Sequence, residues 1–409
     1  MRIFTICEYK LQRQMMRRSY FFAVIRKLRS ILKKRTNQTA ILIVTIIFLL
    51  FFVSKIGVKA GRARKVVRYV SRYQHFVSEA AIRRSPNFSK FVRELKSMSQ
   101  PPFILLLNNH ALNITFNHLC NTIDMDNVHE RTAIVALDQT AYRTMSSRYP
   151  KFKYFLFDSE KLQRRIRGEY SALSSYQLFF LFRANLAAAL AKRKLSYWMT
   201  QQDTLWRSNL ADFNLENRYS NADIIVDRIG NEQMSLYQKR DQWINGATYF
   251  VRGGWRSAGF FELLSTKLKR WCAPDSAIMT YLCMTAQPNG VVCNWIPHSI
   301  MSSSDWLFTD RSHPPHFLQI DHLRSDEKME VFRQSGLNFL GGNNIAVCNR
   351  TAVEHAKKLL QNGTLFPDRY FDFSSRMSEF FLDLLLILIP GGTEFYRKYM
   401  FLLVYGDRL

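Results

Sequence analysis

The sequence predicts an α/β domain with a Rossmann-like, mostly parallel sheet, preceded by an N-terminal transmembrane helix. Three observations favour this fold class. The body of the chain alternates short apolar runs of strand length with stretches long enough for a helix. Residues 170–193 are rich in Leu and Ala and apolar on nearly all sides, which is typical of a helix buried against a sheet. Residues 36–54 are 19 consecutive uncharged residues ahead of that body.

The uncharged stretch 36–54 can cross a bilayer, because a helix of about 20 residues spans a hydrocarbon core of roughly 30 Å. A buried core helix or a signal peptide would be the alternatives, but the stretch lies deep in the chain and no small-residue cleavage pattern follows it. Residues 1–35 carry 11 Lys or Arg, against seven in residues 55–72. We therefore expect a single-pass type II protein with a basic cytoplasmic tail at 1–35 and a lumenal body.

The net charge of +26 does not by itself indicate a nucleic-acid partner. Residues 1–74 hold 18 Lys or Arg against one Glu, so most of the excess is N-terminal. No zinc-finger spacing, RNP-type aromatic motif or basic region leading into heptads accompanies it. We expect no nucleic-acid binding.

The chain after the membrane helix divides into three parts. Residues 55–102 are basic, bear several Ser and end in SMSQPP, so we expect a stem there. The ordered domain is expected at 103–370 and an apolar helical extension at 371–409, whose run 380–390 is too short to span a bilayer. The expected strands are residues 103–107, 132–137, 153–157, 195–200, 223–226 and 247–251.

Cysteines and N-glycosylation sequons agree with a lumenal body. Five of the six Cys follow the span, where an oxidising compartment would let disulfides persist, and an odd number leaves at least one thiol outside such pairs. The sequons begin at Asn87, Asn113, Asn349 and Asn362.

The sequence lacks the strong phosphate and hydrolase motifs. There is no G-x-G-x-x-G after a strand, no P-loop, no H-E-x-x-H, no paired C-x-x-C and no G-x-S-x-G. Scattered carboxylates and amides at strand ends remain as candidates, because ligands of parallel sheets bind beyond the C-terminal ends of the strands. The stretch YWMTQQDTLW, residues 197–206, places two amides and a carboxylate at such an end.

Several short motifs in order resemble a known family. They are NHLC (117–120), AIVALDQTAY (133–142), TQQDTLW (200–206), ADIIVDR (222–228), INGATYFVR (244–252), APDSAIMTYL (273–282) and residues 317–336. Their order and spacing are similar to those of the nucleotide-diphospho-sugar transferase domain of Golgi-type glycosyltransferases, over residues 103–340. The resemblance implies a GT-A-like fold in the Golgi membrane, and transfer of a sugar from a nucleotide-sugar donor to a glycan or glycoprotein acceptor.

The family motif at TQQDTLW implies a divalent cation, Mn²⁺ or Mg²⁺, held by carboxylates against the leaving diphosphate. Trp206 sets the register, so Asp203 matches the second aspartate of the family motif and Gln201 occupies the place of the first. If Gln319-Ile-Asp321 matches the closing segment, Gln319 replaces the metal-binding histidine. We expect Asp203 to be the surviving metal ligand, and the two Gln residues place metal dependence in doubt.

Further candidates follow from the same resemblance. Gln201 and Gln202, with Asp203, are expected to face the donor; Asp138 is expected to touch the nucleotide, or only to cap the next helix. Arg183 would bind a phosphate, or extend from its apolar helix as a snorkelling side chain. Asp275 would act with Asp203 at the reacting sugar or acceptor, or serve as a helix cap.

Two other readings of the sequence remain open. A catalytically inactive family relative could bind nucleotide-sugars, glycans or a partner enzyme in the Golgi without chemistry. A membrane-anchored scaffold would use the α/β domain only as a spacer and would have no concave pocket at the strand ends.

Overall fold

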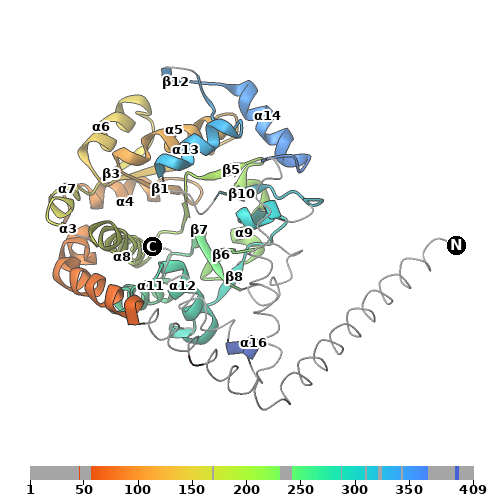
Figure 1. Cartoon of the computed structure of the whole chain (residues 1–409). Coiled ribbons are helices and arrows are strands. Elements are labelled where there is room, and N and C mark those ends of the chain that lie inside the picture. Colours follow the sequence, from red (N-terminus) through yellow and green to blue (C-terminus); the bar gives the residue numbers. More distant parts are fainter. Residues whose placement is uncertain are drawn as a thin grey trace, which may run out of the picture. The chain divides into compact units, whose positions relative to one another are not determined.

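The computed structural model describes Ile46 and residues 57–167, 170–230, 242–286, 288–308, 311–320, 325–341, 344–366 and 392–395. The chain divides into two units, Met1–Arg62 and Ala63–Leu409. The second unit contains the sheets and the site, and everything below concerns this unit unless stated otherwise (Figure 1).

A seven-stranded sheet forms the centre of the domain, with strand order β3-β2-β1-β4-β7-β6-β8. Its strands are β1 (Phe103–Leu107), β2 (Thr132–Ala136), β3 (Lys153–Leu156), β4 (Tyr197–Thr200), β6 (Ile224–Arg228), β7 (Ile244–Val251) and β8 (Cys293–Trp295). Strands β3, β2, β1 and β4 are parallel to one another, whereas β7 runs antiparallel to both β4 and β6. The predicted α/β class with a mostly parallel sheet is confirmed, and the six expected strands lie at β1, β2, β3, β4, β6 and β7.

Helices cover both faces of this sheet, which explains why most residues of its strands are apolar and buried. On β1, Ile104 and Leu106 pack into one core and Leu105 and Leu107 into another, as the alternation of a strand requires. The first core includes α8 (Ser171–Lys192) and α11 (Trp255–Leu268), and the second includes α5 (Leu112–Asn121) and α6 (Gln139–Arg148). Figure 1 shows these two groups of helices on opposite sides.

The segment expected to be a stem packs into the main core instead. Val66 and Val70 are fully buried there, followed by α3 (Glu79–Arg84) and α4 (Phe88–Lys96). The rings of Phe88 and Phe91 lie 5.5 and 5.6 Å from that of Phe155 on β3. The ordered part therefore begins well before Phe103, because the apolar residues among the charges face the sheet.

Two small sheets extend the domain beyond the main one. One has the order β5-β10-β9, formed by β5 (Thr204–Trp206), β10 (Phe317–Gln319) and β9 (Met301–Ser302). The other pairs β11 (Leu340–Gly341) with β12 (Asn344–Cys348), whose last residue forms a disulfide with Cys120 of α5. A second disulfide joins Cys283 to Cys293, and Cys272 belongs to neither.

The membrane prediction concerns residues that the structure scarcely describes. No helix within the described ranges has both the length and the apolar character to cross a bilayer. The expected span 36–54 lies outside those ranges apart from Ile46, and so does the apolar run 380–390.

Candidate functional site

The turn after β4 carries the polar stretch that the sequence singled out. After Thr200 the chain leaves the main sheet, and at Thr204 it enters β5, which pairs antiparallel with β10 so that Thr204 lies opposite Gln319. Gln202 holds this turn to the neighbouring strand, because its Nε2 donates to the carbonyl of Leu106 at 2.8 Å. Gln201 is partly buried and brings no charge to the turn.

Both carboxylate oxygens of Asp203 have protein partners. Nε2 of Gln319 donates to Oδ1 at 2.6 Å, and Nζ of Lys328 donates to Oδ2 in an ion pair. Lys328 comes from the first half of α13 (Ser325–Gln334), and its side chain is 10% exposed against 15% for Asp203. The amide of Gln319 is oriented in turn by Thr204, whose hydroxyl donates to Oε1. Lys328 was not among the predicted site residues.

The residues present do not fit the divalent cation that the family resemblance implied. A hard cation needs several oxygen ligands with net negative charge, and here the carboxylate of Asp203 is neutralised by the ammonium of Lys328. No group of three or more His, Cys, Asp or Glu able to hold a metal occurs within the described residues. Asp321 and His322, the remaining members of the expected closing segment, lie outside those residues. The geometry gives the predicted metal role of Asp203 no support.

Arg183 and Asp275 form a second buried ion pair. Nε and Nη2 of Arg183 on α8 donate to the two carboxylate oxygens at 2.6 and 2.7 Å, and both side chains are almost fully buried. Burial works against the charge of Arg183, but the adjacent carboxylate raises its pKa above the ordinary value. Asp275 is the first residue of α12 (Asp275–Tyr281), and Pro274 is its N-cap. The snorkelling alternative for Arg183 is therefore wrong, because its guanidinium is buried. Asp275 retains part of the capping alternative, since its Oδ1 also accepts from the backbone N–H of Ser276 at 2.9 Å.

A close approach of β7 brings backbone against this pair. Gly246 has φ +77°, and a Cβ there would lie 2.8 Å from Cβ of Ser276 and 3.5 Å from Nη2 of Arg183. Asp227 of β6 fixes the bend by accepting from the backbone N–H groups of Gly246 and the next two residues, at 2.7 to 3.0 Å. Burial raises the pKa of Asp227 to about 7, while these three donors lower it. Sequence reasoning missed both residues, although the Asn-Gly within an apolar strand was a signal for such a bend.

Tyr176 links the two ion pairs. It lies on α8, seven residues before Arg183, and half of it (51%) is exposed. Partial burial raises the pKa of Tyr176, and the charges of Arg183, Asp203, Asp275 and Lys328 also act on it. The structure thus brings Asp203 and Asp275, predicted separately, into the neighbourhood of one side chain.

Asp138 takes the role of helix cap that the sequence left open. Its Oδ1 accepts from the backbone N–H of Ala141 in the first turn of α6, at 2.7 Å. Its Oδ2 accepts from the backbone N–H of Asn109 at the same distance, so it also fixes the loop after β1. The expected contact with a nucleotide stays a prediction.

Two asparagines on α5 hold the site from behind. Nδ2 of Asn121 donates to the carbonyl of Trp206 at 2.9 Å, and its Oδ1 accepts from the backbone N–H of Trp206 at 2.7 Å. One turn earlier, Asn117 bonds the backbone of Leu337 and Phe339 after α13 in the same way. These side-chain amides satisfy backbone N–H and C=O groups that have no strand partner there. Helix α5 therefore fixes both β5, which follows Asp203, and the segment that follows α13, the helix that carries Lys328.

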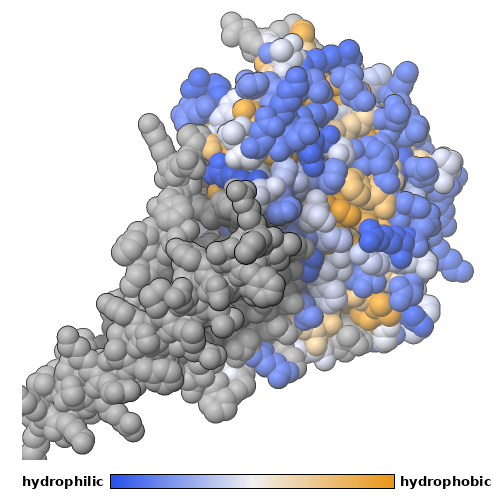
Figure 2. Space-filling model, turned by 90° about the vertical axis from the view of Figure 1, so that its right-hand side faces the viewer, coloured by the Kyte–Doolittle hydropathy of each residue, from blue (hydrophilic) through white to orange (hydrophobic). Residues whose placement is uncertain are grey.

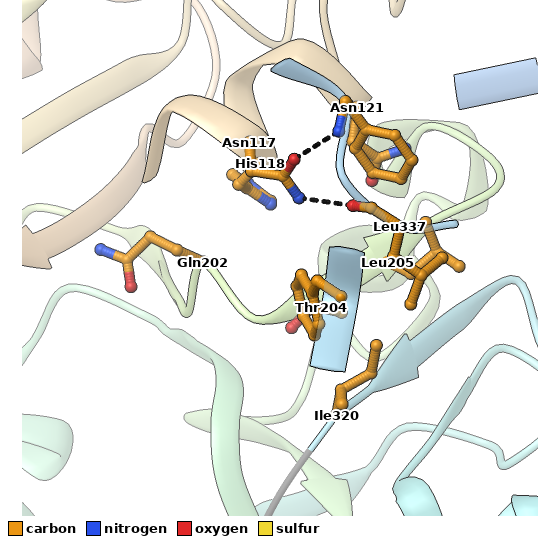
Figure 3. Close-up of a pocket in the computed structure, with 10 residues that line it drawn as sticks. Asn117, His118, Asn121, Gln202, Thr204, Leu205, Ile320 and Leu337 are labelled. Carbon is orange, nitrogen blue, oxygen red and sulfur yellow. Dashed lines mark hydrogen bonds between the residues drawn. The ribbon is translucent and has the colours of Figure 1, made fainter. Parts of the chain in front are cut away.

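A crevice lies between α5, β5, β10 and the end of α13 (Figure 3). Its free volume is about 210 Å³, including the part open to solvent, which is below the roughly 300 Å³ at which small-molecule pockets begin. His118 lines it; burial lowers the pKa of His118 to about 4, and its Nδ1 has no hydrogen-bond partner among the described atoms. This crevice is too small for a nucleotide-sugar and belongs to the support of the site.

The outer surface contrasts with this interior. On the face shown in Figure 2 the described residues are mainly hydrophilic, and apolar residues gather in separate small patches. Exposed charges of this kind are ordinary, whereas buried ones are unusual. Three ion pairs among the described residues are largely buried: Asp203–Lys328, Arg183–Asp275 and Arg131–Glu216. Arg131 precedes β2, at the N-terminal end of that strand, whereas Asp203 follows the C-terminal end of β4, so the first two pairs mark the candidate site.

Comparison with known proteins decides the family. Residues 127–332, half of the chain, match the nucleotide-diphospho-sugar transferase family. The chain belongs to this family. Membership makes it a glycosyltransferase by family and agrees with the resemblance that the motif order implied. Among curated proteins no match was found.

The chain is also similar to solved structures, among them three glycosyltransferases. Mouse xyloside xylosyltransferase 1 is 9% identical, with 54% of this chain and 97% of that chain covered and a TM-score of 0.36. A mannosyltransferase from Pyrobaculum calidifontis, in complex with GDP-Man and Mn²⁺, is 14% identical, with 84% and 96% covered and a TM-score of 0.30. The bifunctional glycosyltransferase WbbM is 12% identical with a TM-score of 0.34; the match takes in 63% of this chain but only 52% of WbbM.

Proposed function

We propose that this family member moves a sugar from a nucleotide-sugar donor to a glycan or glycoprotein acceptor. The proposal is carried by two buried ion pairs, Asp203–Lys328 and Arg183–Asp275, near the C-terminal end of the central strand β4. Asp203 follows the C-terminal end of β4, where parallel sheets bind their ligands. Burying four charges without a ligand to recognise is costly, which favours a functional role.

The chemistry of the donor suggests a role for each pair. A nucleotide-sugar loses its diphosphate, and negative charge grows on that group as the bond to the sugar breaks. The ammonium of Lys328, fixed in place by Asp203 and the Gln319 segment, would stabilise this charge. Asp275, positioned by two hydrogen bonds from Arg183, would orient the sugar or acceptor hydroxyls as a hydrogen-bond acceptor.

The proposed location is the Golgi membrane, with a type II topology and the domain in the lumen. Residues 36–54 support the anchor by their length and lack of charge. The side chains of the four sequon residues, Asn87, Asn113, Asn349 and Asn362, are all exposed. The two disulfides favour an oxidising compartment.

Donor hydrolysis by the purified full-length chain tests the enzymatic proposal. A panel of nucleotide-sugars would be offered, with release of the nucleoside diphosphate as the readout. We expect turnover of one donor, and a loss of about 100-fold or more on Asp203→Ala, because the substitution releases Lys328 from its position. Asp212→Ala is the matched control, since Asp212 is exposed and lies nine residues after Asp203 in the sequence. Melting temperatures of both variants would separate loss of activity from loss of fold.

A second candidate function is supported by the same geometry. Because both oxygens of Asp203 are already engaged, an inactive relative that binds a nucleotide-sugar or glycan without chemistry also fits. Saturable donor binding with no turnover of any donor, with or without an acceptor, would select this candidate over the enzyme.

A further inference from the structure

We propose that the Asp203 position takes no divalent cation and that the ammonium of Lys328 is its resident positive charge. The inference rests on the proposed function in one respect only: it implies that donor binding is independent of metal. The inference is based on the hydrogen bonds that both carboxylate oxygens of Asp203 accept, one from Gln319 and one from Lys328.

The ligand set is incomplete for a cation. Mn²⁺ and Mg²⁺ favour sites with several oxygen or nitrogen ligands, in which carboxylates supply negative charge. Among the described residues, the side chains that hydrogen-bond to the Asp203 carboxylate are Gln319, which is neutral, and Lys328, which is a donor only. Gln201, two positions earlier in the turn, is also neutral. A cation at Asp203 would have to displace a charge-assisted hydrogen bond from each oxygen.

The charges around Asp203 also disfavour a divalent cation. The Asp203–Lys328 pair has no net charge, and neither has the neighbouring Arg183–Asp275 pair. A divalent ion would therefore find no uncompensated carboxylate within either of these two pairs.

The local structure makes this arrangement stable. Gln319 is held in β10 opposite Thr204, and its amide orientation is set by the Thr204 hydroxyl. The backbone N–H of Ile320 donates to the carbonyl of Asp203 at 3.0 Å, which ties the closing segment to the turn. Strand pairing thus fixes the position of Gln319 beside Asp203.

Binding of Mn²⁺ alone to the full-length chain tests the inference without any activity assay. After chelator treatment the protein would be titrated with Mn²⁺ up to about 1 mM, the range of weak binding, and free Mn²⁺ measured by electron paramagnetic resonance. We expect the wild type and Asp203→Asn to give the same curve. Saturable binding by the wild type that Asp203→Asn removes would overturn the inference.

A second pair of variants tests the part played by Lys328. Gln201→Asp restores a carboxylate two positions before Asp203, and the double variant Gln201→Asp with Lys328→Met also removes the repelling ammonium. We expect the single variant to bind Mn²⁺ at least about tenfold more weakly than the double variant. Equal binding by the two would overturn the inference. If the double variant does not fold, as its melting curve would show, the comparison of wild type with Asp203→Asn decides alone.

Failure of the inference and failure of the proposed function give different results. Wild type that binds Mn²⁺ through Asp203 and hydrolyses a donor refutes only the inference. Wild type that binds no Mn²⁺ and neither binds nor hydrolyses a donor refutes the proposed function, while the metal result stands.

Discussion

At the residue scale, Arg183 and Asp275 depend on each other for their charges. They lie 92 positions apart in sequence and form two hydrogen bonds in the interior. Removing one partner leaves the other charge buried without compensation, whereas removing both does not. We expect Arg183→Ala to lower the free energy of unfolding by about 3–5 kcal/mol, and the double substitution to Ala to cost clearly less than the two single costs combined.

Denaturant unfolding of the two single variants and the double variant measures this coupling. Arg270→Ala serves as control, since Arg270 is exposed, and should stay within about 0.5 kcal/mol of the wild type. Single costs that simply add would show that the pair does not act as a unit.

A buried histidine makes stability depend on pH. Burial lowers the pKa of His118 to about 4 in the folded chain, against an ordinary value of 6.5. Between these values the unfolded chain binds a proton that the folded chain does not, so stability falls as pH drops from 6.5 towards 4. The total loss from this residue would be at most about 3 kcal/mol.

Unfolding free energies measured between pH 7 and 4.5 check this. His118→Gln should flatten the decline, while His355→Gln, at an exposed position, should leave the slope unchanged. An identical slope in wild type and His118→Gln would contradict the assigned cause.

Residue identity could be predicted better than residue pairing. Asp203, Arg183 and Asp275 were each singled out by position in a motif, but one sequence does not show that Arg183 meets Asp275 or that Lys328 meets Asp203. Such contacts join elements 92 and 125 positions apart and depend on the tertiary fold. Asp138 shows the reverse case, because a carboxylate just before a helix is a local signal, and its capping was foreseen as one of two roles.

At the element scale, α4 shows how an amphipathic helix was taken for part of a stem. Its charged residues dominate the composition, but Phe88, Phe91, Val92 and Leu95 are all buried. Their spacing of three and four is the pattern of a helix packed on one face. The basic composition of residues 55–102 as a whole concealed this helical spacing of apolar residues.

The core role of α4 predicts a stability effect far from the site. Phe91→Ala should lower the free energy of unfolding by about 3–5 kcal/mol, because it leaves a cavity against Phe155. Lys90→Ala on the exposed face of the same helix should cost less than about 0.5 kcal/mol. The melting temperatures of both variants test this prediction. If the segment were a stem that does not pack on the domain, both substitutions would change the melting temperature equally little.

Short strands were the elements that sequence could not foresee. Strands β5, β8 and β10 have three residues each, too few to show an alternating pattern. Two of them, β5 and β10, pair with each other and hold Asp203 opposite its partners. The part of the fold that completes the site was therefore the part with the weakest local signal.

At the scale of the whole molecule, the order of the motifs carried the prediction. Apolar runs predicted six strands of the main sheet, and their alternation with helices predicted its parallel character. The family match over residues 127–332 agrees with that interpretation. The membrane anchor and the C-terminal extension concern residues outside the described ranges and stay predictions.

Direct donor binding tests the central claim, that the region around Asp203, after the C-terminal end of β4, is a nucleotide-sugar site. The full-length chain, kept in chelator, would be titrated calorimetrically with UDP, GDP, CDP and their sugar conjugates. We predict saturable binding of one nucleotide with a Kd of about 1–100 µM, lost on Lys328→Met and unchanged by added Mn²⁺. Absence of binding by every nucleotide, in chelator and in Mn²⁺ alike, would contradict the account.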